Sequence, residues 1–320
     1  MNRSLELGMT NLDCMASVLS ALAETDPDLL LVTSDSRGSG KVTGFAQKFK
    51  DQVVEVGIAE QDSVGISAGL ASCGKKVFTI SPGSFLSARA LEQVKNDVAY
   101  SKNPVALIGI SSGASYGGLG ATHHSLHDLA VLMAIPGIDL IVPADNAETE
   151  AAIRSYAENP RPVYIRFGKK VMPKIHSSAA EIQIGKASVL SEGNDLLIVA
   201  TGEPLWPAYE AAIELRDQGI RCGLISMHTL NPFDTQTILE MAAAAKAIVT
   251  VEEHSVNGGL GAFTAALLMQ NRIFKPMKII AFPHEELVTG SQTELFNHYG
   301  ISASGIQCAA LELLKQRRIS

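Results

Sequence analysis

Aromatic and charged residues are scarce in this sequence, and their scarcity excludes one class of partner. Phe, Trp and Tyr make up 5% of the 320 residues and charged residues 18%, without any run of Lys or Arg. The net charge at neutral pH is −7. Phosphate backbones need a basic face and single strands need aromatic rings for stacking, so we predict that the protein binds no nucleic acid.

Long apolar runs and closely spaced cysteines are also missing. The apolar segment 129–135 ends at Pro136, far short of the ~20 residues of a membrane helix, and the N-terminus lacks the apolar region of a signal peptide. The four cysteines lie far apart without a CxxC spacing, at Cys14, Cys73, Cys222 and Cys308. Four cysteines can form two disulfides, but this spacing is more typical of reduced thiols. We therefore predict a cytoplasmic protein without membrane contact.

Alternating strand and helix patterns run through the sequence, which is long enough for two domains of ~100–200 residues. Continuous apolar runs followed by helical patterns, such as those at 59–72 and 85–100, predict parallel strands with helices on both faces. The runs lie at 29–33, 53–56, 76–80, 105–110, 138–142 and 163–167, and again at 196–201, 221–227, 247–251 and 278–281. We predict an α/β fold of two three-layer, parallel-sheet domains, residues 1–170 and 185–320, joined by an irregular linker at 171–184.

Polar residues gather where the predicted strands of the first half end. They form loops at residues 33–40, 57–61, 81–85, 111–124 and 143–146. The carboxyl ends of parallel strands share one edge of a sheet, and open sheets bind ligands there. The sequence therefore predicts a ligand site at this edge.

Glu60 is the most informative residue of these loops. Its neighbours are largely apolar, including Val56, Ile58 and Val64. Such surroundings remove water from the carboxyl group and favour its neutral form, which can donate a hydrogen bond to a ring nitrogen. The alternative is an ordinary acidic residue in the first turn of a helix.

Histidines and arginines supply the other candidates. His123 and His124 lie in the glycine-rich loop and are suited to proton transfer or to hydrogen bonding with a substrate. His123 and His127 have the spacing of a metal-binding pair but lack a third ligand, so we predict no metal ligands. Arg89 and Arg166 lie in apolar segments, where each needs either a bound anion or an acidic partner.

The acidic segment at residues 252–254, Glu-Glu-His, ends a strand of the second half. It is consistent with a site, with a subunit interface or with a loop whose polar groups are satisfied internally.

The order of several motifs resembles one family over nearly the whole chain. Residues 54–70, VEVGIAEQDSVGISAGL, resemble the glutamate segment of transketolases and of deoxyxylulose-phosphate synthase. The segments SFLSARALEQVKNDVAYSKNPV, GLGATHHSLHDLAVLMAIPGIDLIVPADNAETEAAI and PVYIRFG follow in the family's order, and the second half resembles its C-terminal domain. The chain is most similar to the C-terminal subunit of split transketolases.

The resemblance implies a partner chain. The family binds the diphosphate of thiamine diphosphate and its Mg²⁺ through a GDG motif, which this sequence lacks. An N-terminal subunit carrying that motif is therefore expected, in an α2β2 heterotetramer with cofactors at the interfaces.

The resemblance also assigns roles to single residues. It implies that Glu60 hydrogen-bonds N1′ of the aminopyrimidine, that Phe85 stacks on this ring, and that Asp35 lies near the cofactor. It implies that His123 contacts the ketose hydroxyls and assists proton transfer. Arg89 and Arg166 match positions near substrate anions in parts of the family.

The sequence departs from ordinary transketolases at substrate positions. Gly118 and Leu119 replace an acidic pair that recognises an acceptor hydroxyl, and Ser111 replaces a histidine that contacts phosphate. Arg37 is an extra cation, which we predict to bind the acid group of the substrate. These changes favour an unusual ketose, such as apulose 4-phosphate or sulfofructose, over xylulose 5-phosphate, with an aldose phosphate as acceptor.

Three other functions stay open at this point. The β subunit of a 2-oxo acid dehydrogenase E1 has the same two-domain plan and also needs a partner. An activity like that of deoxyxylulose-phosphate synthase is a further possibility. A non-catalytic regulatory or scaffolding subunit is the third, although Glu60, Phe85 and His123 in the family's order argue against it.

Overall fold

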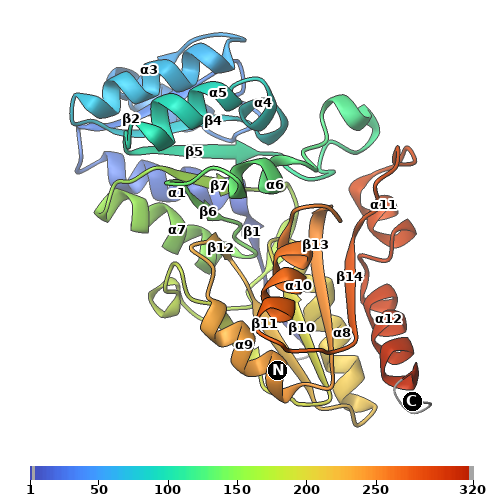
Figure 1. Cartoon of the computed structure of the whole chain (residues 1–320). Helices are drawn as coiled ribbons and strands as arrows, with labels where there is room; N and C mark the ends of the chain where they lie inside the picture. The colour runs from blue at the N-terminus through green and yellow to red at the C-terminus, as the bar shows by residue number, and fades with distance from the viewer. Residues whose placement is uncertain (2–3, 317–320) are drawn as a thin grey trace.

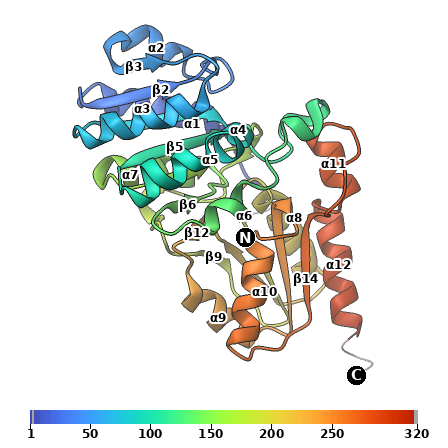
Figure 2. The ribbon, with the colours of Figure 1, turned by 45° about the horizontal axis from the view of Figure 1, so that its top comes forward.

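The computed structural model describes residue 1 and residues 4–316, which form two stacked α/β units, each built around one large sheet (Figures 1 and 2). The first sheet has seven strands in the order β12-β6-β7-β5-β4-β2-β3. Their bounds are β2 Leu29–Thr33, β3 Val53–Glu55, β4 Lys76–Pro82, β5 Val105–Ile110, β6 Asp139–Ile141, β7 Val163–Arg166 and β12 Thr229–Asn231. All neighbouring pairs are parallel except β12 and β6. Most of these strands are buried, as their continuous apolar runs predict.

Helices cover both faces of this sheet (Figure 1). One apolar cluster joins the sheet to α1 and α7, and a second joins its other face to α3, α4 and α6. The bounds are α1 Asn11–Ala23, α2 Thr43–Lys48, α3 Glu60–Ser72, α4 Gly83–Ala88, α5 Leu91–Gln93, α6 Asp128–Met133 and α7 Asn146–Glu158. The three-layer arrangement predicted for the first half is thereby confirmed.

The second sheet has five strands in the order β14-β13-β10-β11-β9, of which only β9 is antiparallel. The strands are β9 Ser188–Ser191, β10 Leu196–Ala200, β11 Cys222–Ser226, β13 Ala247–Ser255 and β14 Met277–Phe282. Its helices are α8 Leu205–Asp217, α9 Thr235–Ala244, α10 Leu260–Gln270, α11 Gln292–His298 and α12 Ala303–Gln316. One apolar cluster includes both the first sheet and α10, so the two α/β units share part of their core.

Two short pairings cross the division that the sequence predicts. β1 (Leu7–Thr10) pairs with β8 (Val171–Pro173), so the linker predicted to be irregular contains a strand. Strand β12, from the second half, adds an antiparallel edge to the first sheet. Strands of three or four residues have no detectable periodicity, and their pairing depends on residues far away in the sequence. The exact boundaries at 170 and 185 stay a prediction.

The prediction of one continuous helix at 85–100 is wrong. The segment begins two residues earlier, with α4, and continues through α5 into a π-helical stretch, η2 Val94–Tyr100. Helical spacing in the sequence does not distinguish one continuous helix from several turns with different hydrogen-bond patterns. Among the described residues, no helix is both long enough and apolar enough to cross a membrane.

Candidate active site

Glu60 is the first residue of α3 and lies at the carboxyl edge of the first sheet. Strand β3 ends at Glu55, and Gly57 then turns the chain with a φ of 72°, a conformation that favours glycine. The Glu60 side chain is buried, with 1% of its surface exposed. Nearby Ile58 is 73% exposed, so the buried carboxylate lies beside an open apolar surface.

Arg89 is the ion partner of Glu60. It follows α4 directly and its Nη1 donates a hydrogen bond to Glu60 Oε2. The same guanidinium lies 4.9 Å from the ring centroid of Phe85, one helical turn earlier. The sequence predicted apolar surroundings for Glu60, and for Arg89 it allowed either a bound anion or an acidic partner. The structure supplies the acidic partner, Glu60 itself.

His123 meets two aromatic rings. Its ring centroid lies 5.5 Å from that of Phe85 and 5.3 Å from that of Tyr116, both edge-on. Its Nδ1 is 2.9 Å from Thr122 Oγ1. Phe85 and His123 are both half-buried, so loop 111–124 brings an imidazole to the ring beside Glu60 and Arg89.

His124, the next residue, has its hydrogen-bond partner within the same loop. It is buried and its Nε2 lies 2.9 Å from the carbonyl oxygen of Gly117 in the same loop. The predicted substrate contact of His124 is therefore not supported, because this hydrogen bond closes the loop on itself. The two adjacent histidines therefore have different partners, which residue type alone does not indicate.

Arg166 has internal partners rather than an open surface. The guanidinium donates to Asp128 Oδ2 at 2.8 Å and to the carbonyl oxygens of Ser125 and Glu253 at 3.0 and 2.8 Å. Burial opposes ionisation of Asp128, but Arg166 outweighs it and holds the pKa of that carboxyl below its ordinary value. The acidic partner that the sequence allowed as an alternative is present, and the predicted substrate contact of Arg166 is not supported.

Asp35 and Arg37 lie in the loop after β2. Asp35 is exposed, and its negative charge adds to the effect of burial in raising the pKa of Tyr116, which places it near the site. Arg37 is partly exposed and forms an ion pair with Glu55, the last residue of β3. Its charge therefore already has an acidic neighbour at the same edge.

Lys169 is a cation that the sequence analysis missed. Its Nζ lies 3.8 Å from the ring centroid of Tyr116, and partial burial lowers its pKa. It comes three residues after β7, so the rule that ligands bind beyond the carboxyl ends of strands could have identified it.

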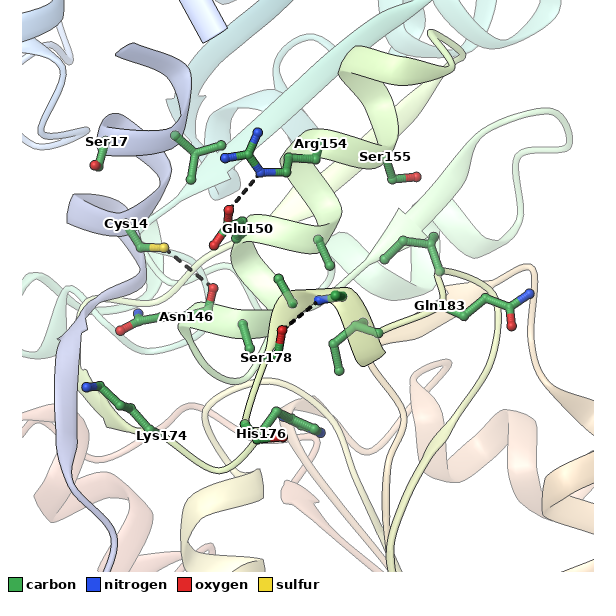
Figure 3. Close-up of a pocket in the computed structure, with 18 of the residues that line it drawn as sticks. Cys14, Ser17, Asn146, Glu150, Arg154, Ser155, Lys174, His176, Ser178 and Gln183 are labelled. Carbon is green, nitrogen blue, oxygen red and sulfur yellow. Dashed lines mark hydrogen bonds and ion pairs between the residues drawn. The ribbon is translucent and has the colours of Figure 1, made fainter. Parts of the chain in front are cut away.

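A separate cavity lies on the opposite face of the sheet. It has a volume of about 1140 Å³ and lies between α1, α7 and segment 174–184 (Figure 3). Arg154 is 2.7 Å from Glu150, and Lys174 is 2.9 Å from Glu6, so both cations have acidic partners. The cavity contains none of the residues gathered around Phe85.

The side chains around Phe85 suit an aminopyrimidine ring. An aromatic ring can stack on such a heterocycle, and a carboxyl group in its neutral form can donate a hydrogen bond to one of its ring nitrogens. In residues 1 and 4–316, no group of three or more His, Cys, Asp or Glu side chains could hold a metal ion. His127, the second residue of the suspected metal pair, has its Nε2 3.1 Å from Ser87 Oγ.

Comparison with known proteins matches both halves of the chain. Residues 8–174 match the family model "Transketolase, pyrimidine binding domain", and residues 185–306 match "Transketolase, C-terminal domain". The chain is 46% identical over 299 residues to one of the subunits of the apulose-4-phosphate transketolase of Phocaeicola vulgatus, covering 93% of this chain and 95% of that protein. It is 34% identical over 305 residues to a 6-deoxy-6-sulfo-D-fructose transketolase subunit of a Clostridium species, covering 95% and 94%.

A solved structure agrees with these matches. The chain is 31% identical to a protein described as "Split gene transketolase, inactive beta4 tetramer", with a TM-score of 0.87. The similarity covers 96% of this chain and 99% of that chain.

Proposed function

Because the chain belongs to the transketolase family and is one subunit of such an enzyme, we propose that it transfers a two-carbon ketol unit together with a partner chain. The observation that carries this proposal is the series of contacts that joins Glu60 through Arg89 and Phe85 to His123 at one edge of the first sheet. A buried carboxylate, an aromatic ring and an imidazole are the groups that a thiamine-dependent site needs from this half.

The family implies thiamine diphosphate, which when bound supplies the carbanion chemistry that protein side chains lack. Glu60 would hold a proton at a pyrimidine nitrogen, and Phe85 would stack on the ring. The sequence has no GDG motif, so we assign the diphosphate and Mg²⁺ to the partner subunit and propose an α2β2 assembly. We place this assembly in the cytoplasm, in keeping with the four free cysteines.

We propose that the donor is an unusual ketose bearing an acid group, either apulose 4-phosphate or 6-deoxy-6-sulfofructose, and that the acceptor is an aldose phosphate. The relatives that act on such ketoses by name support this choice, as do Leu119 and Ser111. Leu119 is 58% exposed on the loop of His123, where it offers no carboxylate to a hydroxyl. His123 would contact the ketose hydroxyls, with Asp35 and Arg89 nearby.

Reconstitution with the partner tests the proposal. The chain, its GDG-bearing partner and the complex are purified, and bound thiamine diphosphate and Mg²⁺ are measured in each. We expect stoichiometric cofactor only in the complex, and turnover of one of the two acid-bearing ketoses above that of xylulose 5-phosphate. Cofactor bound by the chain alone, or decarboxylation of pyruvate by the complex, would contradict it.

The acid group of the substrate has two candidate partners, Lys169 and Arg37. Because a hydrogen bond to a charged group contributes about 1.5–3 kcal/mol, we expect Lys169→Met to raise KM for the ketose at least tenfold. Lys170→Met is the matched control, since Lys170 lies over Phe296, 4.1 Å from its ring centroid. Arg37→Ala in the same assay shows whether both cations contact the acid group, and an unchanged KM removes the residue from the site.

A further inference from the structure

We infer that Glu253, Gln292 and Glu203 of the second half form a bridge that positions the two loops carrying His123 and Lys169. The inference rests on the proposed function, because it concerns how the proposed substrate residues are held. These three residues are buried and lie outside the sheet that carries the site. None of them needs to touch substrate, so each is a positioning residue.

Glu253 holds the base of the His123 loop. The loop closes where the amide of Ser125 donates to the carbonyl oxygen of Gly113 at 2.8 Å. Glu253 Oε1 accepts the amide of Ala114 at 2.8 Å. A Cβ atom on Gly113 would overlap the Glu253 carboxyl group, and Gly113 has a φ of 66°, so the loop backbone lies directly against this carboxylate.

Glu203 holds the Lys169 loop in the same manner. Its Oε1 accepts the amide of Lys170 at 2.9 Å. A Cβ atom on Gly168 would overlap the Glu203 carboxyl group, as at Gly113. Each site loop therefore presses a glycine against a buried glutamate of the second half.

Gln292 joins the two glutamates. Its Nε2 donates to Glu253 Oε1 at 2.6 Å and to Glu203 Oε2 at 2.9 Å. It is the first residue of α11, and the segment just before that helix also lies against Gly117 of the His123 loop. Figures 1 and 2 both show the green loop around residues 117–122 beside α11.

The charges around the bridge explain its need for several donors. Glu203 and Glu253 repel each other, while the Arg166 guanidinium attracts Glu253. Burial and Glu203 together raise the pKa of Glu253 to about 7. Buried carboxylates are tolerated only where hydrogen bonds satisfy them, so losing one donor or acceptor should release the loops.

The kinetic test uses the complex with its partner. We expect Glu253→Ala to lower kcat/KM for the ketose between about tenfold and about hundredfold, because displacing a substrate residue by about 1 Å has such an effect. Glu253→Gln keeps an acceptor oxygen for Ala114 and should recover activity to within about threefold. Affinity for thiamine diphosphate should stay within about threefold in both, since neither change touches Glu60.

Glu252 provides the matched control on the same strand. It is equally buried, but it accepts the amides of Leu260 and Gly261 and so holds α10 rather than a site loop. Glu252→Ala should therefore leave kcat/KM per cofactor-loaded site unchanged. A loss in Glu252→Ala equal to that in Glu253→Ala would overturn the inference and reduce both effects to general destabilisation.

A second measurement follows the loop without any turnover. Chymotrypsin cleaves after Tyr116 and Leu119, and we expect Glu253→Ala to speed this cleavage in the full chain about tenfold, with no change in Glu252→Ala. Gln292→Leu keeps both carboxylates and should act in the same direction if Glu253→Ala does not fold. Unchanged cleavage and kinetics in Gln292→Leu and Glu253→Ala would overturn the inference. If the unmodified complex has no transketolase activity but cleavage still responds, the proposed function is wrong and the bridge stands.

Discussion

Two buried glutamates, Glu60 at the start of α3 and Glu252 within β13, have different surroundings. Glu60 is paired with Arg89, whose side chain is 46% exposed, and lies near the exposed Ile58. Glu252 has no exposed surface and accepts two backbone amides of its own domain, at 2.8 Å each. The first carboxylate lies at an open edge and the second is enclosed by its own chain.

We interpret the difference as that between a half-site and a complete structural unit. Apolar side chains are exposed in the segment that carries Glu60, at Ile58 just before α3 and at Ile66 within it. Exposed apolar groups beside a functional carboxylate are typical of a surface that another chain covers. On this interpretation the enclosed groups support the fold, whereas the open ones serve the reaction.

The largest expected effect is on the free energy of unfolding, when the arginine of each arginine–carboxylate pair is replaced. Arg166→Leu leaves Asp128 buried without its counter-charge, so we expect the free energy of unfolding to fall by about 3–5 kcal/mol. Arg89→Leu should cost less, about 1–3 kcal/mol, because the guanidinium is 46% exposed and water can enter the space that it leaves beside the buried Glu60 carboxylate. Urea unfolding of both variants measures the difference. A stable Arg166→Leu variant with a raised KM for the ketose would restore Arg166 to the substrate site.

Glu60 should show the opposite behaviour, with a large effect on rate and a small one on stability. We expect Glu60→Gln to lower kcat of the complex about 10³-fold, or about 4 kcal/mol of transition-state stabilisation. Asp62→Asn, exposed in the same helical turn, is the control and should keep full activity. Undiminished turnover in Glu60→Gln would favour a non-catalytic subunit.

Where a residue's neighbours along the chain decide its position, that position could be predicted from the sequence. The transketolase resemblance and the α/β fold are confirmed, and Glu60, Phe85 and Asp35 lie at the predicted edge because each follows a buried strand or opens a helix. Features that form where distant segments meet could not be decided from the sequence. Which of its two allowed partners Arg166 takes, the hydrogen bond of His124 to Gly117 and the pairing of strand β12 depend on distant segments or on the local path of a loop.

Contacts with distant parts of the chain also explain why some site residues could not be predicted from the sequence. The role proposed for Lys169 depends on its contact with the Tyr116 ring. The role proposed for Glu203 depends on its hydrogen bond from Gln292, 89 residues later in the chain. The segment 252–254 stood out in the sequence, but three interpretations stayed open because its partners are amides and side chains of other elements. Neighbours in space, rather than residue types, separate Glu252 from Glu253.

The pH dependence of stability should identify Glu252 as the enclosed carboxyl group. Burial raises its pKa in the folded chain to about 7, above the ordinary value of 4.5, despite the amides of Gly261 and Leu260. As the pH rises from 4.5 to 7, the unfolded chain therefore loses this proton before the folded chain does. Stability should fall across that interval, by roughly 3 kcal/mol for one such carboxyl, and stay level above it.

Glu252→Gln removes this proton exchange while keeping the shape of the side chain. Other groups also titrate in this range, among them His254, whose pKa burial lowers to about 4, so only the difference between variant and parent isolates Glu252. We expect urea unfolding to show that the free energy of unfolding of Glu252→Gln rises relative to that of the parent between pH 5 and pH 8. A difference that does not change with pH would mean that water reaches Glu252 and that the start of α10 opens. The second domain would then be no more enclosed than the edge that carries Glu60.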